Sequence, residues 1–232
     1  FNYVDIVFGT HNVSELPSLI NKILSGHKNI CSTADSESEY KINNVKRNNN
    51  FKALLPISIG CNNYCSYCIV PYVRGKERSI EPKIILDNVK KLVDEGVLEI
   101  TLLGQNVNSY GNDLGSNIRF SKLLYDVSLI NGIKRLRFMT SHPKDFNNEI
   151  VDVIKDRPNI CKHIHLPLQA GSNKVLKLMN RKYDKNSYYQ KIELIREMIP
   201  SCSISTDIIV GFPGEEEKDF LETLEMIKNI KF

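Results

Sequence analysis

Residues 53–68 read ALLPISIGCNNYCSYC and join an apolar run to three cysteines. The run from Ala53 to Ile59 is typical of a buried strand, and we predict that it ends at the cysteine loop. Cys61, Cys65 and Cys68 follow with the spacing C-x3-C-x2-C. Three thiolates can bind three irons of a four-iron, four-sulfur cube and leave the fourth iron open, whereas a structural metal site closes its coordination shell. The stretch therefore predicts a strand that leads into a chemically active cluster.

The alternative for these cysteines is a zinc site that recruits a distant His or Cys as its fourth ligand. Zinc sites usually pair two C-x2-C-like halves, and the sequence has no second half. The remaining cysteines, Cys31, Cys161 and Cys202, are isolated, and each has a plain interpretation as a linker or buried thiol. We favour the cluster. A non-catalytic, zinc-bound module that binds RNA is the competing hypothesis from another class.

Composition narrows the class of protein only slightly. The 232 residues are 41% hydrophobic and 25% charged, which is ordinary for a globular chain. The net charge of +4 permits a nucleic-acid partner without demanding one. No apolar run approaches the ~18 residues that a membrane span needs, so we expect no membrane contact. Six cysteines with three clustered fit a reducing cytosol better than a disulfide framework, which predicts a cytoplasmic protein.

Strand and helix patterns alternate after residue 51 and predict an α/β fold with parallel strands. The predicted strands are Ala53–Ile59, Leu98–Leu103, Arg135–Met139, His163–Leu168 and Ser203–Gly211. The predicted helices are Pro82–Glu95, Phe120–Asn131, Phe146–Lys155, Asn173–Met179, Asn186–Met198 and Glu216–Asn229. Polar motifs follow the strands at their C-terminal ends, where an α/β barrel carries its chemistry. We predict a partial (β/α) barrel over residues 51–232, with residues 230–232 starting a sixth strand that is cut short.

The amino-terminal part has a different pattern. A predicted strand at Val4–Phe8 and a predicted helix at Glu15–Leu24 cannot bury their own apolar faces. We interpret residues 1–30 as the C-terminal remnant of a separate α/β domain. Residues 31–50 are polar and are predicted to be a linker.

Five motifs together resemble the methylthiotransferase family of radical S-adenosylmethionine enzymes. They are GCNNYCSYCIVPYVRGKERS, LLGQNVNSYG, FMTSHPKDF, KHIHLPLQAGSNKVLKLMNRKY and STDIIVGFPGE. The resemblance implies a radical S-adenosylmethionine barrel with a [4Fe-4S] cluster on Cys61, Cys65 and Cys68. It also implies exchangeable S-adenosylmethionine on the fourth iron, cleaved by one electron to a 5′-deoxyadenosyl radical. The chain is most similar to members that methylthiolate carbon 2 of N(6)-isopentenyladenosine next to the anticodon. Relatives that act on threonylcarbamoyladenosine tRNA or a ribosomal protein are the alternative.

The resemblance and the loop positions give candidate cofactor contacts. They are Tyr67, Gln169, Ser172, Arg181, Asp207 and Gly211. By resemblance, Arg181 pairs with the carboxylate of S-adenosylmethionine, a task that a bidentate guanidinium suits better than Lys. The alternative is a solvated Arg on a helix face. Asp207 interrupts an apolar strand and is a candidate ribose or amino-group contact, or else a buried acid bonded to a neighbouring loop. Gly211 would let a ligand approach the backbone, or simply form a strand-to-helix turn.

Candidate RNA contacts flank the cysteine loop or follow the second strand of the predicted barrel. They are Arg74, Lys76, Arg78, Gln105, Asn106 and Asn108. The basic side chains suit phosphates, and the amides suit base or ribose hydrogen bonds. A solvated basic loop and ordinary turn-building amides are the alternatives. His142 precedes a proline, where a structural role is the commoner one, so no catalytic residue is assigned beyond the cluster ligands.

Parts that the resemblance implies are absent from the sequence. The family has an upstream domain with three further cysteines for a second [4Fe-4S] cluster, and a small downstream β-barrel that helps bind RNA. We therefore expect a fragment that can cleave S-adenosylmethionine but cannot insert sulfur by itself. The expected partners are the anticodon stem-loop of tRNA and an electron donor such as flavodoxin or ferredoxin, and the expected state is a monomer.

Overall fold

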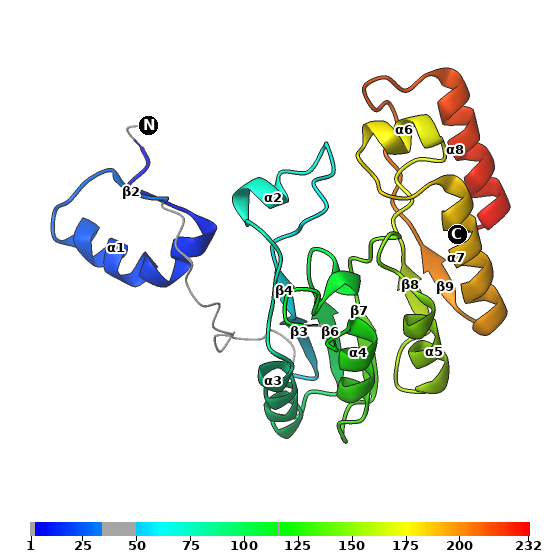
Figure 1. Ribbon diagram of the computed structural model, residues 1–232. Helices are drawn as coiled ribbons and strands as arrows, with labels where there is room; N and C mark the ends of the chain where they lie inside the picture. Colours follow the sequence, from blue (N-terminus) through cyan, green and yellow to red (C-terminus); the bar gives the residue numbers. More distant parts are fainter. Residues whose placement is uncertain (1–2, 34–49, 116) are drawn as a thin grey trace. The chain divides into compact units, whose positions relative to one another are not determined.

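The computed structural model describes residues 3–33, 50–115 and 117–232 (Figure 1). The chain divides into two compact units, which are described separately. The first comprises residues 1–45 with 72–74, and the second comprises residues 46–71 with 75–232. The second unit contains the cysteine loop and all five motifs apart from residues 72–74.

The first unit is built on two short parallel strands and one helix. β1 (Ile6–Phe8) pairs with β2 (Ile30–Ser32), and η1 (Thr10–Glu15) and α1 (Leu16–Leu24) lie between them in the chain. β2 was not predicted, because a three-residue strand depends on its partner rather than on a local pattern. The predicted linker therefore starts inside a strand, and its residues 34–49 lie outside the described residues.

Parallel strands form the sheet of the second unit, which confirms the predicted α/β class. β3 (Lys52–Pro56), β6 (Glu99–Leu103) and β7 (Arg135–Phe138) pair in the order β3-β6-β7. β8 (His163–His165) and β9 (Ser203–Ser205) form a second parallel pair. An isolated parallel bridge joins β7 to the segment that leads into β8.

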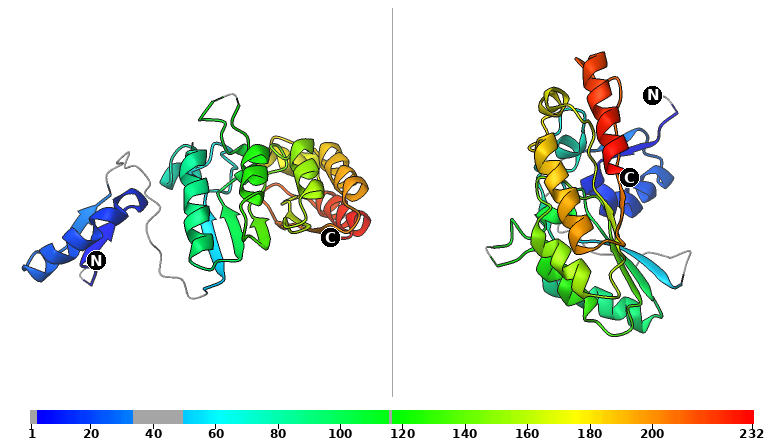
Figure 2. Two further views of the ribbon diagram at one scale, coloured as in Figure 1. Left: turned by 90° about the horizontal axis from the view of Figure 1, so that it is seen from below. Right: turned by 90° about the vertical axis from the view of Figure 1, so that its right-hand side faces the viewer.

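Helices follow these strands and cover one face of the sheet (Figures 1 and 2). They are α3 (Pro82–Asp94), α4 (Phe120–Ser128), α5 (Asn148–Asp156), α6 (Asn173–Leu178), α7 (Lys185–Met198) and α8 (Glu217–Ile230). Buried aliphatic side chains on the two sides, such as Leu102 and Leu136 in strands and Ile85 and Leu124 in helices, make the core. Burial of this apolar surface is the main stabilising force of the layer.

The opposite face of the sheet carries several charges, and it also exposes the side chain of Leu54. Residues alternate along β3 and β7, so that exposed Lys52, Arg135 and half-buried Arg137 face away from the helices. All three cations surround the nearly buried carboxylate of Glu99, with N–O distances of 3.6, 2.5 and 3.5 Å. Paired charges at the amino-terminal ends of these three strands are suited to water rather than to further core packing.

Several strand predictions were wrong. The strands predicted over residues 163–168 and 203–211 are shorter, because β8 ends at His165 and β9 ends at Ser205. The strand predicted over residues 53–59 is broken, because β4 (Ser58–Ile59) leaves the sheet and pairs antiparallel with β5 (Arg78–Ser79). The sixth strand predicted at residues 230–232 does not form, since α8 continues to Ile230 and Lys231 closes it in the left-handed conformation. Two short helices, α2 (Val70–Val73) and η2 (Val107–Ser109), complete the described elements. In the described ranges, no helix has the length and apolar character of a membrane span.

Candidate functional site

The cysteine loop turns back onto the ribbon of β4 and β5. Gly60 has a φ of +75°, and a Cβ there would lie 2.2 Å from a backbone carbonyl oxygen. The N–H of Cys61 donates to the carbonyl of Gly75 at 3.2 Å, and the N–H of Cys68 donates to the carbonyl of Cys65 at 2.9 Å. Only glycine combines this backbone conformation with this close approach. The loop is therefore anchored at its first cysteine.

The three thiols of this loop are free and form no disulfide. Cys61 and Cys65 are buried, and Cys68 is half-buried. Burial raises the pKa of the Cys61 thiol, and the nearby charges of Glu77, Cys65 and Cys68 add to that rise. In the described part of the chain, no three His, Cys, Asp or Glu side chains converge on a single metal ion. Ligands of one zinc lie about 4 Å apart, given Zn–S bonds near 2.3 Å, whereas thiolates on different irons of a cube are more widely spaced. Three thiols in one short loop are the kind of donor set that binds an iron–sulfur cluster, and Cys61, Cys65 and Cys68 stay its predicted ligands.

The carboxyl end of α6 holds the middle of the cysteine loop. The backbone N–H and the hydroxyl of Ser66 donate to the carbonyls of Met179 and Leu178, at 3.1 and 2.9 Å. In return, the side-chain amide of Asn180 donates to the carbonyl of Tyr64 at 2.7 Å. Terminal helix carbonyls have no partner within the helix, so the loop satisfies groups that would otherwise need water. Two segments more than a hundred residues apart thus form one structural piece.

Arg181 follows α6 and reaches the cysteines. The residue is 9% exposed, and Nη1 lies 3.3 Å from Sγ of Cys65 and 3.4 Å from the hydroxyl of Tyr67. Nε donates to the hydroxyl of Tyr183 at 3.0 Å, and Nη2 donates to the carbonyl of Pro167 at 3.3 Å. The alternative of a solvated Arg on a helix face does not describe this side chain.

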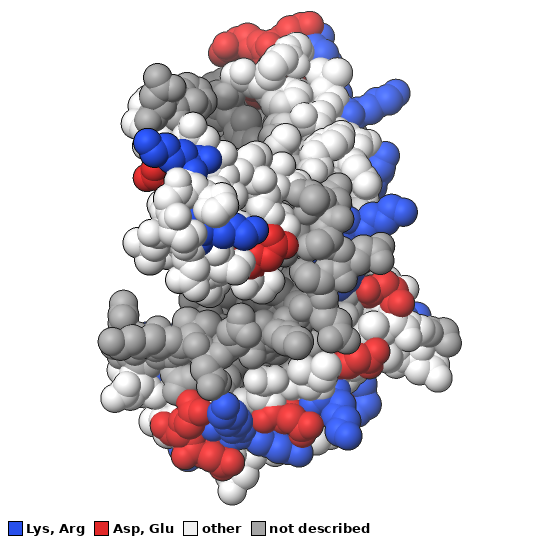
Figure 3. Space-filling model, turned by 90° about the vertical axis from the view of Figure 1, so that its left-hand side faces the viewer, with Lys and Arg blue, Asp and Glu red and all other residues white. Residues whose placement is uncertain are grey.

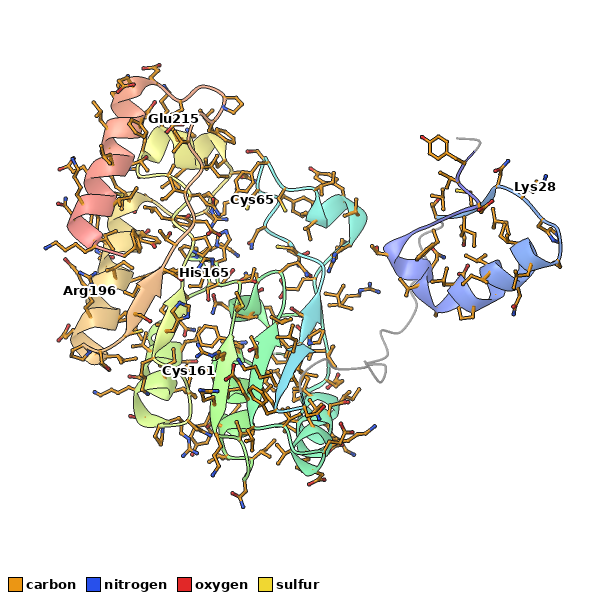
Figure 4. All side chains as sticks on the ribbon, turned by 180° about the vertical axis from the view of Figure 1, so that it is seen from behind. Lys28, Cys65, Cys161, His165, Arg196 and Glu215 are labelled. Carbon is orange, nitrogen blue, oxygen red and sulfur yellow. The ribbon has the colours of Figure 1, made fainter. Side chains whose placement is uncertain are left out.

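The GFPGE turn lies beside the cysteine loop. The rings of Tyr67 and Phe212 meet edge to face with centroids 6.3 Å apart. The Glu215 carboxylate accepts from the N–H groups of Gly211 and Phe212, at 2.5 and 2.9 Å, and so closes the turn (Figure 4). Gly211 has a φ of +75°, and a Cβ there would meet nothing within 4 Å. Open space above this glycine is compatible with the predicted approach of a ligand to the backbone.

Three other candidate contacts follow β8 or extend β9. Gln169 has a φ of +69°, and its N–H donates to the carbonyl of Asp207 at 2.9 Å. The Asp207 side chain is 65% exposed, and one of its oxygens lies 3.3 Å from Nε2 of His165, so it is not the buried acid of the alternative. Ser172 is buried, and its hydroxyl donates to Asp219 at 2.6 Å. Its side chain is therefore engaged within the protein.

The loops after β6 and β7 are bonded to each other. The amide of Asn106 donates to Asp145 at 2.6 Å, and Asn108 accepts from the N–H of His142 at 3.0 Å. All but Asp145 are nearly inaccessible to solvent. Burial lowers the pKa of His142 to about 2, and the positive charge of Arg181 adds to that effect, so the imidazole is neutral. These amides build the loops, and contact with RNA stays a prediction for them.

The basic candidates lie on the surface. Arg74 and Lys76 are exposed and Arg78 is half-buried. Figure 3 shows basic side chains beside acidic ones on one face of the molecule. Contact with RNA stays a prediction for Arg74, Lys76 and Arg78.

Several buried polar atoms on these loops have no hydrogen-bond partner among the described residues. They are Ser58 Oγ, Gln105 Oε1, Asn106 Oδ1, Asn108 Nδ2, Ser141 Oγ, His142 Nε2 and Glu215 Oε1. Buried polar groups in native proteins are nearly always paired, so each unpaired atom calls for an explanation such as a bound ligand. The mixture of donors and acceptors at the carboxyl ends of the strands fits a polar ligand such as S-adenosylmethionine.

Sequence reasoning missed the backbone strain of this region. Tyr64, Thr140, Gln169 and Asn180 all have positive φ, between 49° and 69°. Such residues cost about 1–3 kcal/mol each and concentrate at functional sites. Only Asn180 carried any signal, because asparagine adopts this conformation more readily than other non-glycine residues.

Solved structures with the same architecture are radical enzymes. The radical S-adenosylmethionine methyltransferase TsrM from Kitasatospora setae, solved with cobalamin and a [4Fe-4S] cluster, covers 77% of this chain at 17% identity and a TM-score of 0.63. The match takes in 34% of that enzyme. The cobalamin-dependent S-adenosylmethionine radical enzyme OxsB covers 94% of this chain and 35% of its own length, at 14% identity and a TM-score of 0.60. At such identities the likeness shows the fold alone, which is that of a partial radical SAM barrel.

The family follows from the sequence comparisons. The model of the Radical SAM superfamily matches residues 55–227, and the chain belongs to that superfamily. The tRNA-2-methylthio-N(6)-dimethylallyladenosine synthase of Thermoanaerobacter pseudethanolicus is 52% identical over the whole chain, and so is the enzyme of that name from Natranaerobius thermophilus. The chain spans about half the length of these curated relatives, 50% and 52% respectively. Membership of the superfamily implies an iron–sulfur cluster and S-adenosylmethionine as cofactors.

Proposed function

We propose that this chain is the S-adenosylmethionine-cleaving core of a tRNA methylthiotransferase. The whole protein would add a methylthio group to carbon 2 of N(6)-isopentenyladenosine next to the anticodon. The observation that carries the proposal is the docking of the cysteine loop on the end of α6, which brings Arg181 to Cys65. The names of the relatives supply the substrate class.

In this proposal, Cys61, Cys65 and Cys68 hold the cluster, and residues 51–232 are its domain. When bound, the cluster and S-adenosylmethionine supply one-electron cleavage of the sulfonium. The protein orients the cofactor and excludes water. Asp207 is suited to a ribose or amino group, because His165 fixes one carboxylate oxygen while the side chain stays 65% exposed. The remaining proposed contacts are Tyr67, Gln169, Ser172, Arg181 and Gly211.

The finer features belong to the same proposal. The full-length parent would carry a second [4Fe-4S] cluster for sulfur insertion. Its partners would be the anticodon stem-loop and a flavodoxin or ferredoxin, and it would act as a cytoplasmic monomer. Proposed RNA contacts are Arg74, Lys76, Arg78, Gln105, Asn106 and Asn108.

Anaerobic reconstitution with iron and sulfide tests the cluster assignment. We expect Cys61→Ser, Cys65→Ser and Cys68→Ser each to lose bound iron and the formation of 5′-deoxyadenosine. Cys161→Ser, which removes a half-buried thiol outside the loop, should keep both. A colourless wild-type protein with one tightly bound zinc would overturn the assignment.

The reaction itself is tested with isopentenylated tRNA and the full-length protein. We expect methylthiolated tRNA from the full-length protein. The 232-residue chain should cleave S-adenosylmethionine without forming that product. Methylthiolation by the chain alone would refute the division of labour, and unmodified tRNA from the full-length protein would refute the substrate.

A further inference from the structure

Arg181 is a buried cation that pairs with no carboxylate of the described residues. The residue is 9% exposed, and the hydrogen-bond partners of its guanidinium are two hydroxyls, one carbonyl and one sulfur. No ion pair joins Arg181 to Asp or Glu within the described ranges. A buried charge is costly unless a counter-charge lies nearby. The only contacting group that becomes an anion on binding metal is the sulfur of Cys65, 3.3 Å from Nη1.

The surrounding groups fix the direction of the guanidinium. Nε donates to Tyr183, whose ring also lies 5.1 Å from the guanidinium carbon. Nη2 donates to the carbonyl of Pro167, and the Tyr183 hydroxyl in turn donates to the carbonyl of Leu168 at 2.7 Å. The planar fork cannot rotate without breaking these bonds. Nη1 is therefore aimed at the cysteine loop before any cofactor arrives.

The count of N–H groups limits what else Arg181 can do. A guanidinium has five of them, and Tyr183, Cys65, Tyr67 and Pro167 take four. A bidentate contact with a carboxylate needs two parallel N–H groups. Pairing with S-adenosylmethionine in that manner would break one of the observed bonds, whereas the bond to sulfur already exists.

We propose that Arg181 donates an N–H···S hydrogen bond to the Cys65 thiolate and thereby makes the iron–sulfur cluster easier to reduce. The proposal rests on the cluster of the proposed function and not on the tRNA substrate. Reduction adds negative charge to the cluster and its thiolates. A positive donor beside one thiolate stabilises that state, because hydrogen bonds to sulfur and local charge set cluster potentials.

The experiment is an anaerobic redox titration of the reconstituted full-length protein without S-adenosylmethionine, followed by electron paramagnetic resonance. We expect Arg181→Gln to lower the ratio of reduced to oxidised cluster about tenfold at a fixed potential, which is a shift of about 59 mV toward negative values for a one-electron couple. Arg181→Lys keeps the charge but loses the fork, so its potential should fall between the two. Arg157→Gln is the matched control, since that guanidinium bonds Ser128 instead of a cysteine.

Two further measurements make the outcome decisive. A variant with Cys61, Cys65 and Cys68 all changed to Ala gives the signal of any other cluster in the protein, which is subtracted. If Arg181→Gln binds no iron, the potential of Arg181→Lys decides. If Arg181→Gln and Arg181→Lys both keep the wild-type reduction potential and bind S-adenosylmethionine more weakly, the proposal is overturned. Arg181 would then be a cofactor ligand only. Because no tRNA is present, failure of the proposed substrate would not affect this result.

Discussion

Gly60 is the residue whose replacement should damage the cysteine loop most directly. It stands next to Cys61 with a φ of +75°, and a Cβ would lie 2.2 Å from the carbonyl oxygen of Lys76 and 2.6 Å from that of Gly75. Both atoms belong to backbone that cannot move like a flexible side chain. Gly75 offers a matched control, because its φ is +72° and a Cβ there would meet nothing within 4 Å.

Replacing either glycine by alanine costs stability through backbone strain, and at Gly60 a steric clash adds to this cost. An alanine in the left-handed region costs about 1–2 kcal/mol at either position. At Gly60 the added carbon must also push the two strands of the ribbon apart. That movement breaks the 3.2 Å hydrogen bond from Cys61 to Gly75, worth about 1 kcal/mol, and adds a comparable loss of packing. We expect Gly60→Ala to cost about 3–4 kcal/mol and Gly75→Ala about 1–2 kcal/mol.

Thermal unfolding of the cluster-free protein, followed by circular dichroism, measures the difference. For a chain of 232 residues, 1 kcal/mol corresponds to about 2–4 °C in Tm. Gly60→Ala should therefore melt about 4–8 °C below Gly75→Ala, and should bind less iron on reconstitution because Cys61 is displaced. Equal melting temperatures and equal iron content in the two variants would refute the steric reasoning.

Two further predictions concern the support of the site. The Ser172 hydroxyl lowers the pKa of Asp219 from 3.8 to about 2. The charged carboxylate therefore stabilises the fold above about pH 4, and this stabilisation is lost as the pH falls toward 2. Ser172→Ala should unfold at a higher pH during acid titration, and an unchanged midpoint of acid unfolding would contradict this. Tyr188 is fully buried and donates to the carbonyl of Leu166 at 2.7 Å. Tyr188→Phe removes this bond while the carbonyl keeps its second donor, the Thr206 hydroxyl at 3.0 Å, so it should cost about 0.5–1.5 kcal/mol in urea unfolding. Tyr189→Phe should stay within about 0.5 kcal/mol, and equal losses would exclude the hydrogen bond as the cause.

The alternation of strands and helices could be predicted from the sequence, but the short elements could not. β6 and α3 show clear apolar periods, so both were predicted with boundaries accurate to one residue. β4 and β5 have two residues each, and their pairing depends on a loop that folds back over the cysteines. No local pattern encodes such a contact. The end of α8 was misjudged for a related reason, because an apolar Ile230 fits a strand or a helix equally well until the surrounding core is known.

In the candidate site, too, local patterns could be predicted from the sequence and long-range contacts could not. The spacing of the cysteines marked the loop, whereas Asp207, expected inside a long strand, lies beyond the end of β9 and stays a predicted cofactor contact. The contact between Arg181 and Cys65 spans 116 residues of sequence, and nothing near either residue indicates it. Ser172 shows the reverse, since its place in a polar loop suggested a ligand while its hydroxyl is committed to Asp219.

The strained residues explain how these distant parts are held in place before a cofactor binds. Tyr64 and Asn180 both have positive φ, and the amide of Asn180 donates to the carbonyl of Tyr64. This hydrogen bond joins the two strained segments, and such conformations persist where surrounding contacts hold them. Ser66 adds two bonds to the end of α6 in the same place. The position of Arg181 is consequently fixed by the folding of the cysteine loop, so any change that loosens this junction should alter the cluster environment even when all three cysteines remain.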